Sequence, residues 1–180
     1  ARQVFDSRGN PTVEAEVFLD GNISASAISP SGASTGAFEA YELRDANQEN
    51  FLGKSVNKAV ENINKKVAKK LKGLDSEDQS KIDKALLDLD GSENKKNLGA
   101  NATLAVSLAN SKSSAISLNK PLYKNLGKSF SLPNPLMNII NGGAHADNDL
   151  NIQEFMIRPD SAINFMDAVE KSFLVIQNLK

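Results

Sequence analysis

The chain has 180 residues, of which 40% are hydrophobic and 24% charged, and its formal net charge is −1 at pH 7. These values are ordinary for a globular protein, and so small a net charge provides no general attraction to nucleic acid or to an anionic membrane. The sequence has no cysteine, which excludes disulfides, thiol catalysis and cysteine-bound zinc. It also has no apolar run long enough to cross a bilayer. We therefore expect no nucleic-acid partner and no membrane partner, and from the start at Ala1 we expect a few residues to precede the sequence.

The first thirty residues predict a three-stranded antiparallel meander. Residues 2–5 form a short strand, and a dense turn cluster follows them. Residues 12–19 alternate between apolar and polar side chains, which is typical of a half-buried strand. Asp20 and Gly21 are a preferred dipeptide of tight hairpins, so residues 23–28 are expected to return as the partner strand.

Apolar residues at helical spacing predict helices through the middle of the chain. Their starts and ends are predicted from capping residues. The predicted elements are a helical turn at 38–44, a helix capped by Ser55 that runs to Leu71, a helix that starts at a capping box of Asp75, Ser76 and Gln79 and ends at Gly91, and a helix over 97–118.

The character of the sequence changes after residue 125. Three strands followed by several helices indicate an α+β domain over residues 1–125. Residues 126–180 contain a Gly-, Ser- and Pro-containing boundary, two short apolar strands around a polar loop, and a final helix. Asn164 is the predicted cap of that helix, and its predicted inner face consists of Ala168, Val169, Ser172, Phe173 and Ile176.

The loop between the two late strands carries the only histidine of the sequence, His145. Gly142 and Gly143 precede it, and the strand that follows, residues 152–157, contains Gln153 and Glu154. A histidine on a polar loop followed by a strand with a carboxylate predicts an active site at the strand ends. Strand alternation places Gln153 and Glu154 on opposite faces. The alternative is an ordinary surface histidine and a glutamate on a solvated strand face.

A second candidate site is the small, polar loop at residues 31–36, SGASTG. Its backbone N–H groups suit an anion-binding nest, and its hydroxyl and carbonyl oxygens suit a hard cation such as Mg²⁺ if the loop acts as a lid. The loop is not a Walker A motif, because no Gly-Lys-Ser/Thr follows, and its glycine spacing is not that of a dinucleotide site. An ordinary surface loop is the alternative.

Several motifs in register resemble the enolase (phosphopyruvate hydratase) family. They are DSRGNPTVE at 6–14, PSGASTG at 30–36, LGANATLAVSLA at 98–109, NIINGGAHA at 138–146 and QEFMI at 153–157. The resemblance implies an α+β capping domain (three-stranded antiparallel meander followed by helices) at 1–125. Residues 126–180 are then the first strands and helix of an α/β (TIM-like) barrel.

The resemblance also implies the activity, which is reversible dehydration of 2-phosphoglycerate to phosphoenolpyruvate with two Mg²⁺ ions per site. Ser34 is then a ligand of the second Mg²⁺. His145 approaches the phosphate end of the substrate, Glu154 lies near the leaving hydroxyl as a catalytic residue, and Gln153 contacts the substrate. Arg2 is placed at the contact of a homodimer or higher homo-oligomer. The expected location is cytoplasmic, with a secondary cell-surface or secreted pool as the alternative.

The chain is less than half as long as a complete enolase. The family's lysine base, general-acid glutamate and three magnesium carboxylates match no position in it. We therefore expect these 180 residues to be the amino-terminal portion of an enolase and to be inactive alone. The alternative is a short, non-catalytic protein that keeps the capping domain as a binding or interaction module.

Overall fold

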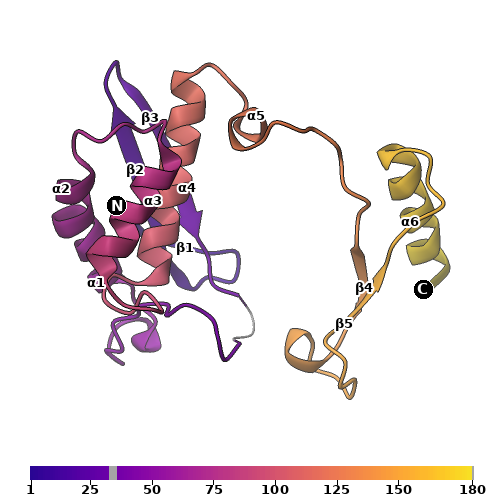
Figure 1. Ribbon diagram of the computed structural model, residues 1–180. Helices are drawn as coiled ribbons and strands as arrows, with labels where there is room; N and C mark the ends of the chain where they lie inside the picture. The colour runs from indigo at the N-terminus through magenta and orange to yellow at the C-terminus, as the bar shows by residue number, and fades with distance from the viewer. Residues whose placement is uncertain (33–35, 180) are drawn as a thin grey trace. The chain divides into compact units, whose positions relative to one another are not determined.

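The computed structural model describes residues 1–32 and 36–179, which form two compact units (Figure 1). The first unit contains residues 1–32 and 36–128, and the second contains the described residues from Ser129 onward.

The first unit begins with a three-stranded antiparallel sheet in the order β1 (Arg2–Phe5), β2 (Pro11–Leu19) and β3 (Ile23–Ser29). The sheet confirms the predicted meander. Its first turn is closed by the carboxylate of Asp6, whose Oδ1 accepts the backbone N–H groups of Arg8 and Asn10, both at 2.9 Å. These bonds direct the chain from β1 back into β2.

Helical segments follow the sheet in the first unit. Their bounds are the 3₁₀ turn η1 (Phe51–Gly53), α1 (Asn57–Asn62), the π-helical segment η2 (Ile63–Val67), α2 (Ala68–Leu71), α3 (Gln79–Asp90), α4 (Ala100–Ser117) and α5 (Leu122–Leu126). Helix α4 packs on β2 and β3, and α3 packs on α4 (Figure 1). The helix predicted from Ser55 to Leu71 is therefore present in three consecutive segments.

The core lies between the sheet and α4. Ala102, Ala105 and Ala109 are fully buried on α4, opposite Val13 and Ala15 of β2, so the helix backbone can approach the strands closely. Ser113, also fully buried on α4, donates to the carbonyl of Val17 at 3.1 Å, so the hydroxyl costs little to bury.

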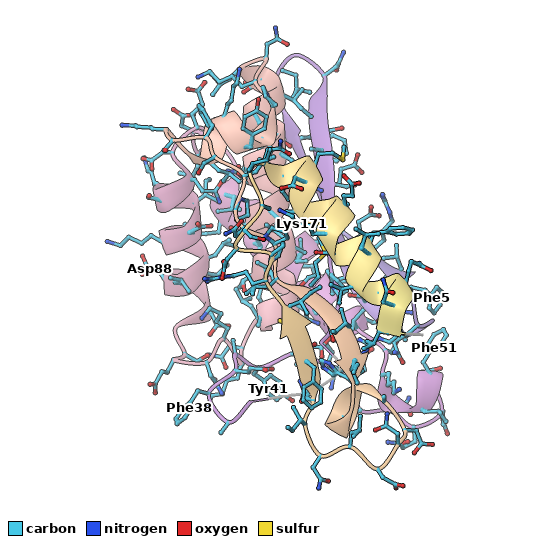
Figure 2. The ribbon with its side chains drawn as sticks, turned by 90° about the vertical axis from the view of Figure 1, so that its right-hand side faces the viewer. Phe5, Phe38, Tyr41, Phe51, Asp88 and Lys171 are labelled. Atoms are coloured by element: carbon cyan, nitrogen blue, oxygen red, sulfur yellow. The ribbon has the colours of Figure 1, made fainter. Side chains whose placement is uncertain are left out.

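Phe5 at the end of β1 and Phe51 in η1 make an edge-to-face contact beside the sheet (Figure 2). Their ring centroids are 5.5 Å apart and the rings are inclined by 60°. Such a pair adds stabilisation beyond the burial of its area, and here it fixes a short helical turn to the edge of the sheet.

The predicted helical turn at 38–44 is wrong, because most of this segment is irregular. Its backbone groups bond to the region around the start of α4 instead. The backbone N–H of Tyr41 donates to Asn94 O at 2.7 Å, and the backbone carbonyl of Tyr41 accepts from Ala100 N at 2.8 Å. The backbone N–H and carbonyl of Leu43 form two hydrogen bonds with the side-chain amide of Asn101. Non-local partners for the backbone therefore outweigh the local helical pattern.

Two predicted caps are also wrong. Ser55 does not cap α1, because its hydroxyl donates to Gln3 Oε1 at 2.8 Å. The carboxylate of Asp45 caps this helix instead and accepts the N–H groups of Asn57 and Lys58 at 3.0 and 2.9 Å.

Helix α3 is capped by the side chain of Asp78, three residues after Asp75, which accepts a hydrogen bond from Lys81 N at 3.0 Å. The predicted end at Gly91 is confirmed, since this residue has φ +65°.

The second unit contains an antiparallel pair, β4 (Met137–Asn141) and β5 (Glu154–Ile157), a 3₁₀ turn η3 (Gly143–His145) between them, and helix α6 (Phe165–Leu179). The predicted cap of α6 is confirmed, because Asn164 Oδ1 accepts Asp167 N at 2.9 Å. One turn later Lys171 bonds Asp167 Oδ2 and Ser161 O, each at 2.9 Å (Figure 2). These bonds hold the start of α6 against the loop before it.

The predicted inner face of α6 is only partly buried. Ala168 and Ser172 are 1% exposed, as predicted, whereas Val169 and Phe173 are 37% and 56% exposed. Two short strands and one helix do not cover the whole apolar stripe. In the part of the chain that the structure describes, no helix is both long and apolar enough to cross a bilayer.

Candidate active site

The loop between β4 and β5 has its shape because Gly142 lies against the opposite side of the loop. A Cβ at this position would come within 2.5 Å of the carbonyl oxygen of Ile152 and 2.6 Å of Leu150 Cβ, so only glycine fits. Gly143 has φ +52°, which also favours glycine. Gly142 N donates to Gln153 O at 3.0 Å, and Gly143 N donates to Leu150 O at 2.7 Å. The Gly-Gly pair thus closes the loop tightly and sets the position of the next turn.

His145 ends that turn and contacts both polar residues at the start of β5. Its Nδ1 lies 2.8 Å from Glu154 Oε1, and its Nε2 lies 3.0 Å from Gln153 Nε2. The side chains of His145 and Glu154 are 23% and 28% exposed, so the pair is half-buried but open to a small molecule. The structure therefore brings together the three residues that the sequence singled out in this segment.

The two contacts define a consistent proton arrangement for a neutral imidazole. Nδ1–H donates to the carboxylate of Glu154, and Nε2 accepts an N–H of the Gln153 amide. A protonated ring has N–H groups on both sides, and rotation of the amide by half a turn presents the oxygen of Gln153 instead. The glutamine can therefore serve either charge state of His145, while Glu154 accepts from Nδ1 in both.

The expected conflict between Gln153 and Glu154 does not arise, because β5 begins at Glu154. Gln153 lies in the bend before the strand, so the alternation of a regular strand does not apply to it. The β4–β5 register also shifts between Asn138 and Ile140. Both side chains consequently reach the same imidazole.

Sequence reasoning missed Asn148, whose side chain holds the same loop through two hydrogen bonds. Its Nδ2 donates to Asn141 O at 3.0 Å and its Oδ1 accepts Leu150 N at 3.0 Å. An asparagine within a polar loop is the ordinary signal for such a side-chain-to-backbone turn. That signal was present in the sequence, but it does not reveal which backbone groups are bound.

Ser34, the predicted magnesium ligand, lies outside the described residues, but one flank of its loop is held by arginines that the sequence reasoning also missed. Arg8 Nη2 donates to the carbonyls of Ser31 and Gly32 at 2.6 and 3.3 Å. Arg44 Nη2 donates to Ser31 Oγ at 2.7 Å and to Glu42 Oε1 at 2.8 Å. Residues 31 and 32 are therefore fixed to the sheet end of the first unit.

Asp6 is part of the same arrangement. The hydrogen bond from the backbone of Asn10, with a further bond from Arg8 N and the charge of Arg8, holds the pKa of the Asp6 carboxyl below its usual value, against the opposing effect of desolvation. Its carboxylate also lies 3.7 Å from the Arg8 guanidinium, which donates to the carbonyls at the start of the loop. The turn after β1 thus helps to position the arginine.

Among residues 1–32 and 36–179, no three His, Asp or Glu side chains are grouped so that they could hold a metal ion. The described residues therefore do not by themselves form a magnesium site. Arg2, placed by the resemblance at a contact between subunits, pairs within the chain, with Nε 2.6 Å from Glu14 Oε2 and Nη1 3.3 Å from Glu16 Oε2. Its side chain nevertheless remains 57% exposed.

The fold and the site define a class of protein: an α+β domain of a meander and helices, followed by two strands with a His–Glu–Gln cluster where their connecting loop meets β5. Comparison with protein families agrees. The model of the enolase N-terminal domain matches residues 1–126, and the model of the enolase C-terminal TIM barrel domain matches residues 129–180. The chain belongs to the enolase family, and it consists of the capping domain and the start of the barrel domain.

A curated relative extends the comparison to a particular protein. An enolase of Pelagibacter ubique (strain HTCC1062) is 60% identical over 182 residues, an alignment that covers 100% of this chain and 43% of the relative. The chain thus spans less than half the length of the relative that it matches.

Proposed function

We propose that the complete protein to which this chain belongs catalyses the reversible, magnesium-dependent dehydration of 2-phosphoglycerate to phosphoenolpyruvate. The observation that carries the proposal is the His145–Glu154 contact of 2.8 Å, with Gln153 on the other ring nitrogen, in a chain of the enolase family. The relative's name supports the same reaction, since it is an enolase.

In this proposal His145 and Gln153 bind the substrate. Imidazole and amide N–H groups are suitable donors to phosphate or carboxylate oxygens. When the substrate arrives, the amide N–H released from the His145–Gln153 contact turns to its oxygens, and Nε2 of His145 donates to them once it carries a proton. Until then the two groups satisfy each other's hydrogen bonding, so neither is left unpaired in the half-buried site.

Glu154 is the catalytic residue of the cluster in this proposal. Its carboxylate accepts from His145 and is 28% exposed, so one oxygen remains accessible to the leaving hydroxyl group. A proton that reaches the imidazole can pass to Glu154 along the 2.8 Å contact and from there to the departing oxygen. The pair thereby links substrate binding to the departure of water.

Magnesium belongs to the proposal through family membership. Bound Mg²⁺ supplies positive charge to a developing enolate. The described residues contain no cluster that could hold it, so its ligands would be Ser34 and residues outside this chain. A homodimer is proposed for the complete protein with Arg2 at the contact, since this arginine remains largely exposed beside Glu14 and Glu16.

The proposal is tested by incubating the purified complete protein with 2-phosphoglycerate and following phosphoenolpyruvate by its ultraviolet absorbance. We expect product to appear with added Mg²⁺ and to stop when a chelator removes the ion. His145→Ala should raise KM for 2-phosphoglycerate, because it removes a donor to the substrate. Failure of the folded complete protein to form product with Mg²⁺ would refute the proposed reaction. An unchanged KM would remove His145 from the substrate site.

A further inference from the structure

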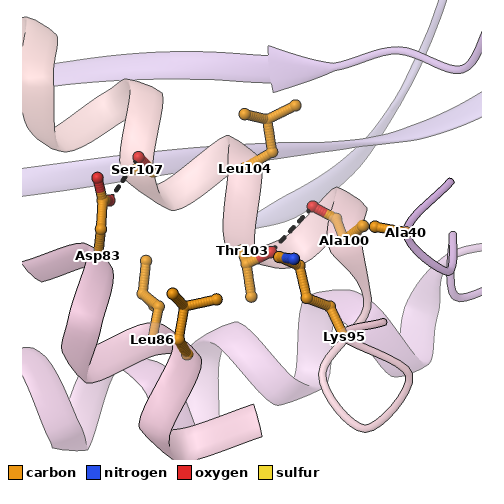
Figure 3. A pocket seen from close by; sticks show the side chains of 9 residues that line it. Ala40, Asp83, Leu86, Lys95, Ala100, Thr103, Leu104 and Ser107 are labelled. Carbon is orange, nitrogen blue, oxygen red and sulfur yellow. Dashed lines mark hydrogen bonds between the residues drawn. The ribbon is translucent and has the colours of Figure 1, made fainter. Parts of the chain in front are cut away.

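A hollow of about 300 Å³ lies between α3 and α4 in the first unit (Figure 3). Three leucines line it: Leu86 and Leu87 from α3, and Leu104 from α4. Ala40 and, from α4, Ala100 and Thr103 also line it. Hollows of this size with apolar walls and a few polar groups are typical of small-molecule sites.

The walls are apolar, yet two of the leucines remain in contact with water. Leu87 is 49% exposed and Leu104 is 50% exposed, whereas Leu86 behind them is 2% exposed. A ligand that covers the outer pair removes apolar surface from water, which favours binding. The hydroxyl of Thr103 donates to Ala100 O at 3.1 Å, so a ligand does not have to supply an acceptor for it.

A lysine whose ammonium group makes no ion pair with the described residues lies at one end of the hollow. Lys95 is half-buried, and Figure 3 shows its side chain directed along the wall toward Thr103. Its backbone has φ +60°, an uncommon conformation for a residue with a side chain, and is fixed by Lys95 N to Ser92 O and by Gly99 N to Lys95 O. Within the described ranges no carboxylate pairs with its ammonium group. A cation in this setting attracts an anion.

The other end of the hollow carries the opposite charge, but there the charge is already bonded. Asp83 Oδ1 accepts from Ser107 Oγ at 2.6 Å (Figure 3). It also accepts from Gln79 Nε2 at 2.9 Å. Leu86 and Leu104 lie between this carboxylate and Lys95. A second negative group on a ligand would therefore meet repulsion at Asp83 without a free donor to receive it.

We propose that this hollow is a binding site for a small monocarboxylate with an apolar chain. The carboxylate pairs with Lys95, and the chain lies over Leu86, Leu87 and Leu104 toward Asp83. The charge at each end fixes the direction of the ligand and selects against dicarboxylates. The site is formed by the capping domain alone and does not involve His145, Gln153 or Glu154, so it is independent of the proposed dehydration.

The test is calorimetric titration of the complete protein with octanoate and with octanedioate, which differ by the second carboxylate. We expect saturable binding of one octanoate per chain and at least roughly tenfold weaker binding of octanedioate, because its far end meets Asp83. Lys95→Met should weaken octanoate binding roughly tenfold or more, which corresponds to the loss of a charge-assisted bond. Lys95→Arg should retain it.

The matched control is Lys96→Met, which removes the same charge from the neighbouring exposed lysine, outside the hollow. It should leave octanoate binding unchanged, and Leu104→Gln should weaken it. Absence of saturable octanoate binding overturns the proposal. Equal effects of the Lys95 and Lys96 substitutions, or equal affinity for the two acids, also overturn it. Thermal melts of each variant establish that a lost affinity does not reflect unfolding.

Discussion

Replacing Gly142 by alanine puts a methyl group where the β4–β5 loop has no space. The new Cβ would lie 2.5 Å from Ile152 O, 2.6 Å from Leu150 Cβ and 2.7 Å from Leu150 O. Carbon atoms pack at about 3.5–4.0 Å, so the far side of the loop must retreat by roughly 1 Å. Two of the three atoms belong to backbone, which cannot turn aside as a flexible side chain does.

The displacement should affect stability and activity. Overpacking of this kind costs about 1–3 kcal/mol of unfolding free energy. The retreating segment leads directly into Gln153 and Glu154, which contact His145 at 3.0 and 2.8 Å. A shift of about 1 Å in such a cluster can lower turnover by about 10²-fold. We therefore expect Gly142→Ala to fold with reduced stability and to lose most of its turnover.

Gly143→Ala is the matched control. Here the nearest neighbours of a Cβ lie at 3.4–3.6 Å, which is tolerable, but φ is +52°. The cost is then the left-handed conformation, about 1–2 kcal/mol, without a push on β5. Denaturant unfolding and the phosphoenolpyruvate assay on the complete protein compare the two variants. Wild-type turnover in Gly142→Ala, or an equal loss in Gly143→Ala, would refute the assigned role of the close contact.

Three further predictions concern other parts of the chain. Asp90→Asn should lower the unfolding free energy by about 1.5–3 kcal/mol in denaturant titrations at neutral pH. The Asp90 residue is only 3% exposed, and its carboxylate accepts hydrogen bonds from Leu98 N at 2.6 Å and from the backbone N–H and the hydroxyl of Ser92. Burial raises the pKa of Asp90, but these bonds outweigh it and hold the pKa below the usual value of an aspartate. The contribution is therefore present above that usual value and is lost as the pH falls through the lowered pKa. An equal acid sensitivity in the variant would contradict this. Asp45→Ala should cost about 0.5–2 kcal/mol in thermal melts, by exposing the start of α1, and no change would remove Asp45 as its cap. Ser34→Ala should raise the Mg²⁺ concentration needed for turnover and leave the melting temperature unchanged, and an unaltered Mg²⁺ dependence would exclude Ser34 as a ligand.

The strands and long helices were predictable because their patterns are local. The alternation over residues 12–19 places Val13 and Ala15 in the core, and the small residues of 97–118 form the buried helix α4. The caps were not predictable in the same way. Asp45 lies twelve residues before Asn57, whose N–H it accepts, so no window around the helix start contains the signal.

The candidate site also combines features that follow from local sequence with features that depend on the folded structure. The Gly-Gly loop, His145 and Glu154 stood out as residue types, but the relation of Gln153 to Glu154 depended on where β5 begins. A one-residue difference in a strand boundary decides whether the two side chains share a side, and periodicity does not fix boundaries so finely. The anchoring of Ser31 and Gly32 by Arg8 depends on tertiary proximity across more than twenty residues.

The most direct measurement of the account is the turnover of Glu154→Gln in the complete protein. This substitution keeps the shape and hydrogen-bonding capacity of the side chain next to His145 but removes its charge and its ability to take up a proton. Glu170→Gln, at an exposed position of α6, removes the same charge away from the cluster and serves as control. We expect kcat to fall at least about 10²-fold for Glu154→Gln, with little change in KM, and to stay unchanged for Glu170→Gln. Equal turnover of wild type and Glu154→Gln would contradict it.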